Sequence, residues 1–254
     1  MMRFFRKIRK KLFVDNKFSK YLLYAIGEIV LVVIGILIAL AINNYNQERS
    51  LRNKEQAYLK GLKEEFQTSK IKLAELIEVN RNNYRGAKRL IELKAKEGEK
   101  DNVELSEIIY QSFSSNISFN PNNSLLTEMI SSGSLKDIED NELRGRLTNW
   151  FSRLEVISRQ ERELEHQRES VIDIFRSDAY SLRTILDQTG VSEEVGLPRS
   201  DENLSNLELM DSIKFENEVL LFILYCHSTE KAHYLPLMQE IDYVISLIDQ
   251  ELKI

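Results

Sequence analysis

One apolar segment limits what this chain can fold into more than any other feature. Residues 21–42, from Tyr21 to Ile42, contain a single charged side chain, Glu28. A helix of that length rises about 33 Å, which is enough to cross a hydrocarbon core of about 30 Å. Tyr21, Tyr24 and Tyr45 lie near its ends, where amphipathic rings prefer the membrane interface. We therefore predict one membrane-spanning helix at residues 21–42.

The charge on either side of this segment predicts its orientation. Residues 1–20 carry eight Lys and Arg side chains against one Asp, a net charge of +7. Residues 43–254 carry 27 basic and 38 acidic side chains, a net charge of −11. The positive-inside rule then places the basic segment in the cytoplasm and residues 43–254 outside it. An acidic domain of this kind also argues against nucleic acid as a partner, because binding to phosphate needs a basic surface.

Two alternatives remain open at the N-terminus. Phe4, Phe5, Ile8 and Leu12 fall on one side of a basic helix, which favours a helix lying on the inner leaflet, although a long positive flank is an equal interpretation. The run Ala39-Leu40-Ala41 also fits a signal-peptide cleavage pattern. Against cleavage, the basic region and the apolar stretch are both longer than a signal peptide needs.

The position of Glu28 predicts a contact between helices inside the membrane. Val32, Gly35 and Ala39 follow Glu28 on one helical face, and Gly35 with Ala39 lets two backbones approach closely. We call Glu28, Val32, Gly35 and Ala39 the membrane seam and expect it to mediate self-association, with Glu28 hydrogen-bonded across it. Two other interpretations are a proton-accepting acid in an ion-coupled complex and an acid tolerated through local water.

Two sequence blocks are similar to a known family. FFRKIRKKL, NKFSKYLLYAIGEIVLVVIGILIAL and INN followed by an aromatic residue and Asn occupy residues 3–46, and SSGSLKDIEDNELRGRL occupies residues 131–147. This pattern resembles a bacterial family of membrane proteins of unknown function. Members commonly carry Gln in place of Ala41 and Trp in place of Tyr45, and a Gln there weakens the signal-peptide interpretation. The resemblance implies location and architecture and no chemistry.

Helical periodicity dominates residues 43–254, so the predicted fold class is all-α. We expect an elongated, antiparallel, coiled-coil-like bundle with three long arms and two short helices at the turn. The first arm has the seam Leu62, Phe66, Ser69, Leu73, Ile77, Asn80, Tyr84, Ala87 and Ile91, and the second has the seam Leu143, Leu147, Trp150, Leu154, Ile157, Glu161, Leu164, Arg168, Val171, Phe175, Asp178, Leu182 and Ile185. The predicted long helices are 44–96, 140–188 and 211–252, the last interrupted near Pro236, and the short ones are 101–113 and 124–132, on either side of a loop at 114–124.

Polar and apolar runs within these helices lead to three further predictions. Glu161, Arg168 and Asp178 interrupt the second seam. They could fix the register or meet partners in a bundle, but we expect them rather to face water at a widened layer. The charged run RQERELEHQRE at residues 159–169 is interpreted as a solvated face with i,i+4 ion pairs. VLLFILYC at residues 219–226 is too short to cross a membrane and predicts a buried core helix.

The chain offers little that indicates catalysis. It has no phosphate-binding loop, dinucleotide fingerprint, nucleophile elbow or zinc-protease helix. A metal site of Cys226, Glu230 and His233 is conceivable from spacing but is a minor alternative, and the single cysteine excludes an internal disulfide. We therefore expect no enzyme activity, no cofactor and no metal.

These observations converge on a protein of the bacterial inner membrane with one span, a cytoplasmic segment at 1–20 and an extracytoplasmic domain at 43–254. The predicted function is a structural, scaffold or signal-receiving interaction module of the cell envelope. Its predicted partners are the lipid bilayer, further copies of itself and an envelope protein whose identity the sequence leaves open. The alternative is a subunit of an ion-coupled membrane complex that uses Glu28.

Overall fold

A computed structural model describes residues 18–202 and 204–252, and for residues 18–21 it describes the backbone alone. The surface helix predicted at residues 1–12 lies outside this described part. The described residues form helices and connecting loops without a strand, which confirms the all-α fold class. The chain divides into two compact units, residues 1–56 and residues 57–254.

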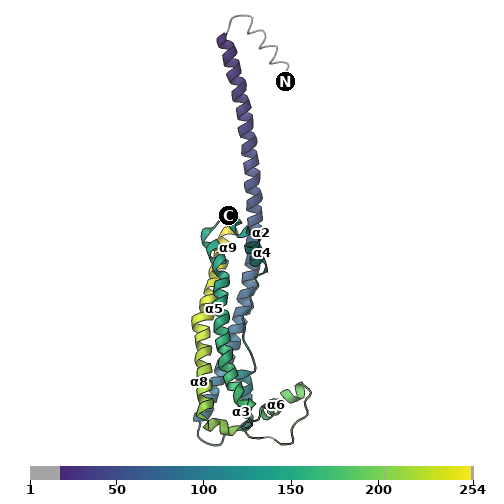
Figure 1. Ribbon diagram of the computed structural model, residues 1–254, viewed down its shortest axis with the longest axis vertical. Coiled ribbons are helices and arrows are strands. Elements are labelled where there is room, and N and C mark those ends of the chain that lie inside the picture. Colours follow the sequence, from purple (N-terminus) through teal and green to yellow (C-terminus); the bar gives the residue numbers. More distant parts are fainter. Residues whose placement is uncertain (1–17, 203, 253–254) are drawn as a thin grey trace. The chain divides into compact units, whose positions relative to one another are not determined.

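The first long helix, α2, spans Phe18–Ala95. It includes the apolar segment and continues past it without a break, so that the predicted helices at 21–42 and 44–96 form one helix (Figure 1). Gly98, with φ of 108°, lies in the short connection that follows the helix. Such a φ favours glycine, and it reverses the chain where the sequence predicts the end of the first arm.

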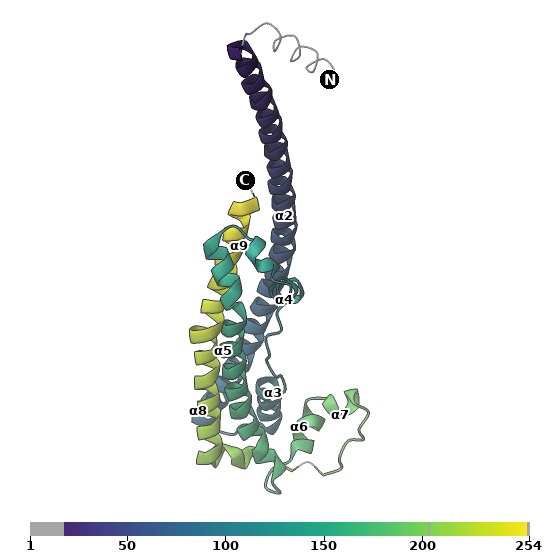
Figure 2. The same cartoon turned by 45° about the horizontal axis from the view of Figure 1, so that its top comes forward.

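Within residues 57–254, four arms lie side by side and alternate in direction along the chain (Figure 1, Figure 2). The second arm is not one helix. It consists of a helix at one end of the bundle, an extended stretch and a second short helix near the other end. In order, the arms are the part of α2 from Ala57 onward; α3 (Asn102–Phe113) with the stretch 114–123 and α4 (Ser124–Ser131); α5 (Asn141–Ile172); and α8 (Ile213–Ser228), the π-helix η4 (Thr229–Tyr234) and α9 (Leu235–Leu252).

The extended stretch of residues 114–123, which we call the return segment, runs antiparallel to α2. Ser69 on α2 exchanges hydrogen bonds with the backbone of Asn122, and Asn83 donates to the backbone carbonyl of Ser115. Fourteen helical residues rise about 21 Å and seven extended residues cover about 23 Å, so the two contacts fit one straight path. The prediction of two short helices together at a turn is therefore wrong, because α3 and α4 lie at opposite ends of this arm.

Local capping explains where several helices begin. Asp101 accepts a hydrogen bond from the backbone N–H of Val103 at the start of α3, and Asp140 accepts one from Leu143 at the start of α5. Both helices begin where the sequence predicts them, because a carboxylate satisfies N–H groups that lack a partner in the first turn. Between α4 and α5 the chain forms the short 3-10 helix η1 (Ser134–Asp137).

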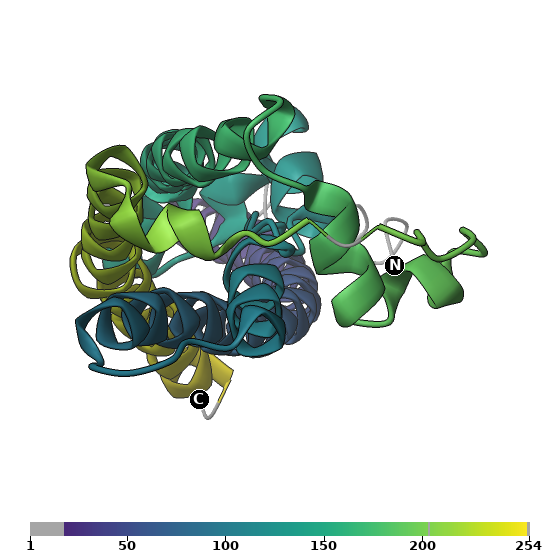
Figure 3. The ribbon, with the colours of Figure 1, turned by 90° about the horizontal axis from the view of Figure 1, so that it is seen from below.

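The second long helix ends earlier than predicted. The sequence predicts one helix to residue 188, whereas α5 ends at Ile172 and passes into the 3-10 helix η2 (Asp173–Arg176). Ser181 then accepts a hydrogen bond from the N–H of Thr184 and starts a separate helix, so a cap lies inside the predicted heptads. The segment that follows projects beside the bundle and contacts α3 (Figure 3). It contains α6 (Leu182–Gln188), α7 (Val191–Glu194) and η3 (Leu207–Asp211).

The last arm changes its winding just before Pro236. The π-helix η4 separates α8 from α9, and Pro236 is the second residue of α9. Proline lacks an N–H group and clashes with the preceding turn of a regular helix. The interruption that the sequence predicts near Pro236 is present, in the form of a π-helical segment.

The core lies along the whole length of the four arms. Trp150 is buried and packs on Phe66, with ring centroids 4.8 Å apart, and its indole N–H donates to Asn123. Phe113 packs on Phe222 with centroids 5.0 Å apart. One prediction about the core is wrong in part. Residues 219–226 bury one face of α8 only, because Leu220, Leu221 and Leu224 are exposed.

Candidate functional site

The first candidate site is the apolar part of α2. It contains an 18-residue window with a mean hydropathy of 2.9, none of which is buried, and it is the one described helix that is long and apolar enough to cross a membrane. Glu28 is half-buried, whereas Val32, Gly35 and Ala39 are exposed. A Cβ atom placed on Gly35 would meet no atom within 4 Å. Val32, Gly35 and Ala39 thus lie along one open side of a single helix, and the half-buried Glu28 lies on the same face.

The second candidate site is a buried carboxylate between three arms. The Oε1 atom of Glu161 on α5 accepts a hydrogen bond of 2.7 Å from the Tyr234 hydroxyl and one of 2.9 Å from the backbone N–H of Phe119. Burial raises the pKa of Glu161 above its usual range, and the two hydrogen bonds oppose that shift. Glu161 therefore joins α5 to η4 and to the return segment. The prediction that it faces water is wrong.

Arg168 is also placed inside the bundle rather than at a wet layer. Its guanidinium donates to the backbone carbonyl of Phe113 over 2.9 Å and lies 3.5 Å from the carboxylate of Glu169. It borders a cavity of about 10 Å³, enough for roughly one water molecule. Asp178, the third polar residue of the predicted seam, is exposed, as expected. It lies beyond the end of α5 and takes no part in a seam.

Polar contacts also gather around the π-helix η4. Arg81 donates twice to Glu230, over 3.1 and 2.9 Å, and these hydrogen bonds lower the pKa of Glu230. Gln160 on α5 donates to Thr229 over 3.0 Å. A π-helical turn leaves its flanking backbone groups in an altered register, and such turns are frequent at functional positions. Here the segment is held from both α2 and α5.

The metal site that spacing makes conceivable is not assembled. Glu230 is engaged by Arg81, and burial raises the pKa of the Cys226 thiol well above its usual range, which keeps it in the neutral form. Burial lowers the pKa of His233. Within the described residues, no group of three His, Cys, Asp or Glu side chains is arranged to hold a metal ion.

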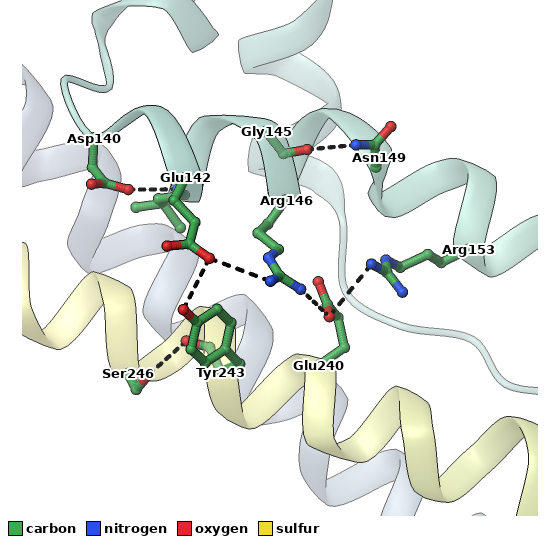
Figure 4. Close-up of polar contacts among 10 residues, drawn as sticks. Asp140, Glu142, Gly145, Arg146, Asn149, Arg153, Glu240, Tyr243 and Ser246 are labelled. Atoms are coloured by element: carbon green, nitrogen blue, oxygen red, sulfur yellow. Dashed lines mark hydrogen bonds and ion pairs between the residues drawn. The ribbon is translucent and has the colours of Figure 1, made fainter.

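A further cluster ties the start of α5 to α9 (Figure 4). Arg146 lies between two carboxylates, 2.8 Å from Glu240 and 3.3 Å from Glu142, and its guanidinium stacks 4.6 Å from the Tyr243 ring centre. Arg153 adds a second contact to Glu240 at 3.5 Å. The opposite charges of these groups neutralise one another between α5 and α9. Their contacts fix the two helices in register.

The charged run at 159–169 has two different sides. Glu155, Arg159 and Glu163 are exposed, as predicted for a solvated face, although no ion pair joins these three described side chains. Glu161 in the same run is buried. Sequence reasoning missed its contacts with Tyr234 and Phe119, and the signal that could have found them is its position in an otherwise apolar seam.

The fold and these contacts define an all-helical protein with one candidate membrane span and a bundle held by polar contacts between arms. The chain belongs to a family of unknown function (DUF6090), whose family model matches residues 28–175. The match covers the membrane seam, the return segment and α5, and it confirms the resemblance to a family without an assigned activity. Residues 3–27 of the similar block lie outside it. No curated protein and no solved structure matches the chain.

Proposed function

We propose that this chain is a single-span membrane anchor carrying a helical interaction module, with its N-terminus in the cytoplasm and its bundle in the extracytoplasmic space of a bacterial envelope. The observation that carries the proposal is the apolar window of α2, which no part of the described chain buries. Exposed apolar helices of this length are unstable in water and stable in lipid. The net charge of +7 on residues 1–20 supports the orientation.

The role that fits this anchor best is structural, as a scaffold or a signal-receiving module for another envelope component. The polar groups of the bundle support it, because Glu161, Arg81 and Arg146 each join two arms. Such contacts give a helical surface a fixed shape, which a binding module needs. The partner is a second envelope protein, and the chemistry that recognises it is not assigned further.

Self-association through the membrane seam is part of the proposal. A carboxyl group in the membrane interior is costly, by about 2.5–3.5 kcal/mol for an acid at the helix centre, unless another polar group meets it. In a dimer the Glu28 side chains of the two copies lie at the same depth and can hydrogen-bond across the membrane seam. Gly35 and Ala39 carry little or no side chain, so two helices can approach closely along the face that contains Glu28.

The orientation is tested by cysteine labelling in intact cells. In a Cys226→Ala background, Ser152→Cys on an exposed position of α5 is compared with Lys7→Cys in the basic segment. We expect a membrane-impermeant maleimide to label Ser152→Cys in spheroplasts and to label Lys7→Cys only after lysis. The reverse pattern, or a mature chain that begins at Ile42, would contradict the anchor.

The membrane seam is tested by one substitution on its own face and one on the opposite face. Gly35→Leu blocks close approach and is expected to reduce crosslinked dimer in native membranes. Leu37→Phe, on the far side of the same helix, is the matched control and is expected to leave the dimer unchanged. Equal effects of both would remove the seam from the proposal.

Glu28→Gln separates the two functions proposed for the acid. Glutamine keeps a hydrogen bond across the seam but cannot exchange a proton, so retained dimer and an unchanged cellular phenotype support a structural acid. Retained dimer with a null phenotype would favour the ion-coupled alternative.

A further inference from the structure

Helix α8 has two apolar faces. Phe215, Val219, Phe222 and Cys226 point into the core of the bundle and are buried. On the other side, Ile213, Leu220 and Leu224 are exposed to 72%, 39% and 62%. We call the exposed set Ile213, Asn217, Leu220, Leu221 and Leu224 the α8 outer face.

Within this arm, large aliphatic side chains are exposed on α8 alone. Along α9, which continues the arm, the exposed positions include Gln239, Asp242 and Gln250, which are polar, and Tyr243, whose hydroxyl donates to Glu142. Figure 2 shows α8 at the periphery of the bundle beside α5, and no further helix among the described residues lies outside it. Single exposed leucines are ordinary on protein surfaces, but three on two adjoining turns of one helix indicate a covered surface.

The spacing of the α8 outer face points to a coiled-coil contact. Ile213, Asn217, Leu220 and Leu224 follow one another by four, three and four residues. That is the alternation of d and a positions in a heptad, with Asn217 and Leu224 at a, and Ile213 and Leu220 at d. The pattern differs from that of the buried face, whose residues lie at the c and f positions of the same heptads.

We propose that the α8 outer face is a contact between two copies of this chain, with the two α8 helices parallel and in register. Asn217 is the reason for choosing this occupant and this orientation. In a parallel pair Asn217 lies opposite the partner's Asn217, and the two amides can bond to each other. In an antiparallel pair an a residue lies opposite a d residue, so Asn217 would face the partner's Leu220 and lose its hydrogen bonds, which is costly.

The charges beside the face are compatible with this pairing. Glu216 is the nearest acidic side chain and is neutralised within its own chain by Lys94, 2.7 Å away. In a parallel pair Glu216 would face the partner's Leu221, and the g position that would face Lys214 falls before the start of α8, so no like charges oppose each other. Electrostatic repulsion therefore does not oppose self-pairing of this face.

The contact is small, because α8 offers only two heptads. Stable complexes between free proteins bury about 1,200 Å² or more in total, and a pair of helices this short falls below that. Anchoring two copies in one membrane raises their effective concentration and compensates for a small contact. In this respect the inference rests on the proposed membrane anchor.

Disulfide trapping of the full-length chain in native membranes tests the contact. In a Cys226→Ala background, Asn217→Cys, Leu220→Cys and Leu224→Cys are compared with Glu218→Cys on another side of α8 and Gln239→Cys on α9. We expect mild oxidation to give at least about tenfold more disulfide-linked dimer at the first three positions, because facing a and d side chains meet directly. Equal yields at all five positions would indicate random collision and would overturn the proposal.

A second set of variants tests whether the leucines stabilise the contact. The double variant Leu220→Lys with Leu224→Lys is expected to lower dimer trapped through Asn217→Cys about tenfold or more, while the helical circular dichroism of the chain stays unchanged because both side chains are exposed. An unchanged yield would overturn the proposal, as would a crosslink from Leu220→Cys to a different protein without a chain-to-chain product.

The two failures can be told apart. If maleimide labelling places the bundle outside the cytoplasm and the trapping pattern is flat, the α8 contact fails and the anchor stands. If labelling contradicts the orientation and the trapping pattern still peaks at positions 217, 220 and 224, the anchor's orientation fails and the α8 contact stands.

Discussion

Tyr234→Phe removes one hydroxyl from the centre of the bundle and tests the buried carboxylate. The Tyr234 side chain is fully buried, and its hydroxyl donates to Glu161 over 2.7 Å. A hydrogen bond to an ionised group contributes about 1.5–3 kcal/mol, against about 0.5–1.5 kcal/mol for one between neutral groups. Because Phe119 still donates to the same oxygen, we expect a loss of about 1–2 kcal/mol, where the two ranges meet.

The single tryptophan provides the assay. Trp150 is buried against Phe66 within the bundle. Its fluorescence during urea unfolding of the full chain in mild detergent therefore follows the free energy of unfolding of the bundle alone. The matched control is Tyr243→Phe, which removes a hydroxyl that donates over 2.9 Å to Glu142 on the surface, and we expect little change from it because water replaces the lost partner.

The effect of Tyr234→Phe should also depend on pH. Burial raises the pKa of Glu161 in the folded state, so the stability associated with this group is fully present below its unfolded pKa and is lost as pH rises through the folded value. Above that value Glu161 is charged and its bond from Tyr234 is stronger, so the difference between wild type and variant should grow with pH. A loss below about 0.5 kcal/mol, or one equal to that of Tyr243→Phe, would refute the reasoning.

Two further predictions concern the packing and the acid stability of the bundle. Gly86→Ala should destabilise it by about 1–3 kcal/mol, because the new Cβ would overlap the buried Ser112. Gly61→Ala on the same helix should be neutral or stabilising by up to about 1 kcal/mol, since the new Cβ meets only the flexible end of Leu125. Urea unfolding of both variants measures the two effects, and equal losses of stability would contradict the prediction. Arg81 lowers the pKa of Glu230, so wild type should lose stability as pH falls through that value, and Glu230→Gln should flatten this acid limb in a pH series of unfolding midpoints. If Glu230→Gln loses stability at low pH as steeply as wild type does, other carboxylates account for the acid sensitivity.

Several parts of the fold follow from sequence because they depend on local chemistry. The caps Asp101 and Asp140 act on N–H groups within three residues, so their effect can be read from neighbours in the chain. The apolar segment of α2 is predictable for the same reason, since length and hydropathy are properties of the segment itself. The early end of α5 was missed because a heptad pattern continues past Ile172 while Ser181 provides a competing cap.

The outward leucines of α8 could not be predicted, because hydropathy does not tell which side of an apolar helix another element covers. The run at residues 219–226 is apolar all round, and the sequence alone favours complete burial. The other three arms cover only one face of α8, so Leu220, Leu221 and Leu224 remain exposed. A mismatch of this kind between composition and burial indicates a contact that the single chain does not contain.

Four of the five polar residues in the two predicted seams have a common physical reason, and the fifth, Asp178, is exposed beyond the end of α5. Each of the four bonds to backbone that departs from the regular α-helical pattern or lies at its end: Ser69 to Asn122, Glu161 to Phe119, Arg168 to the carbonyl of Phe113 at the end of α3, and Asn80 to the carbonyl of Cys226, close to the π-helix η4. A regular helix satisfies its own backbone groups, whereas an extended arm or a π-helical junction presents N–H and C=O groups to its neighbours. Burying those groups unpaired would be costly, so the facing helices supply polar side chains. Polar interruptions of an apolar seam therefore indicate where the neighbouring arm is not a regular helix, rather than where water enters.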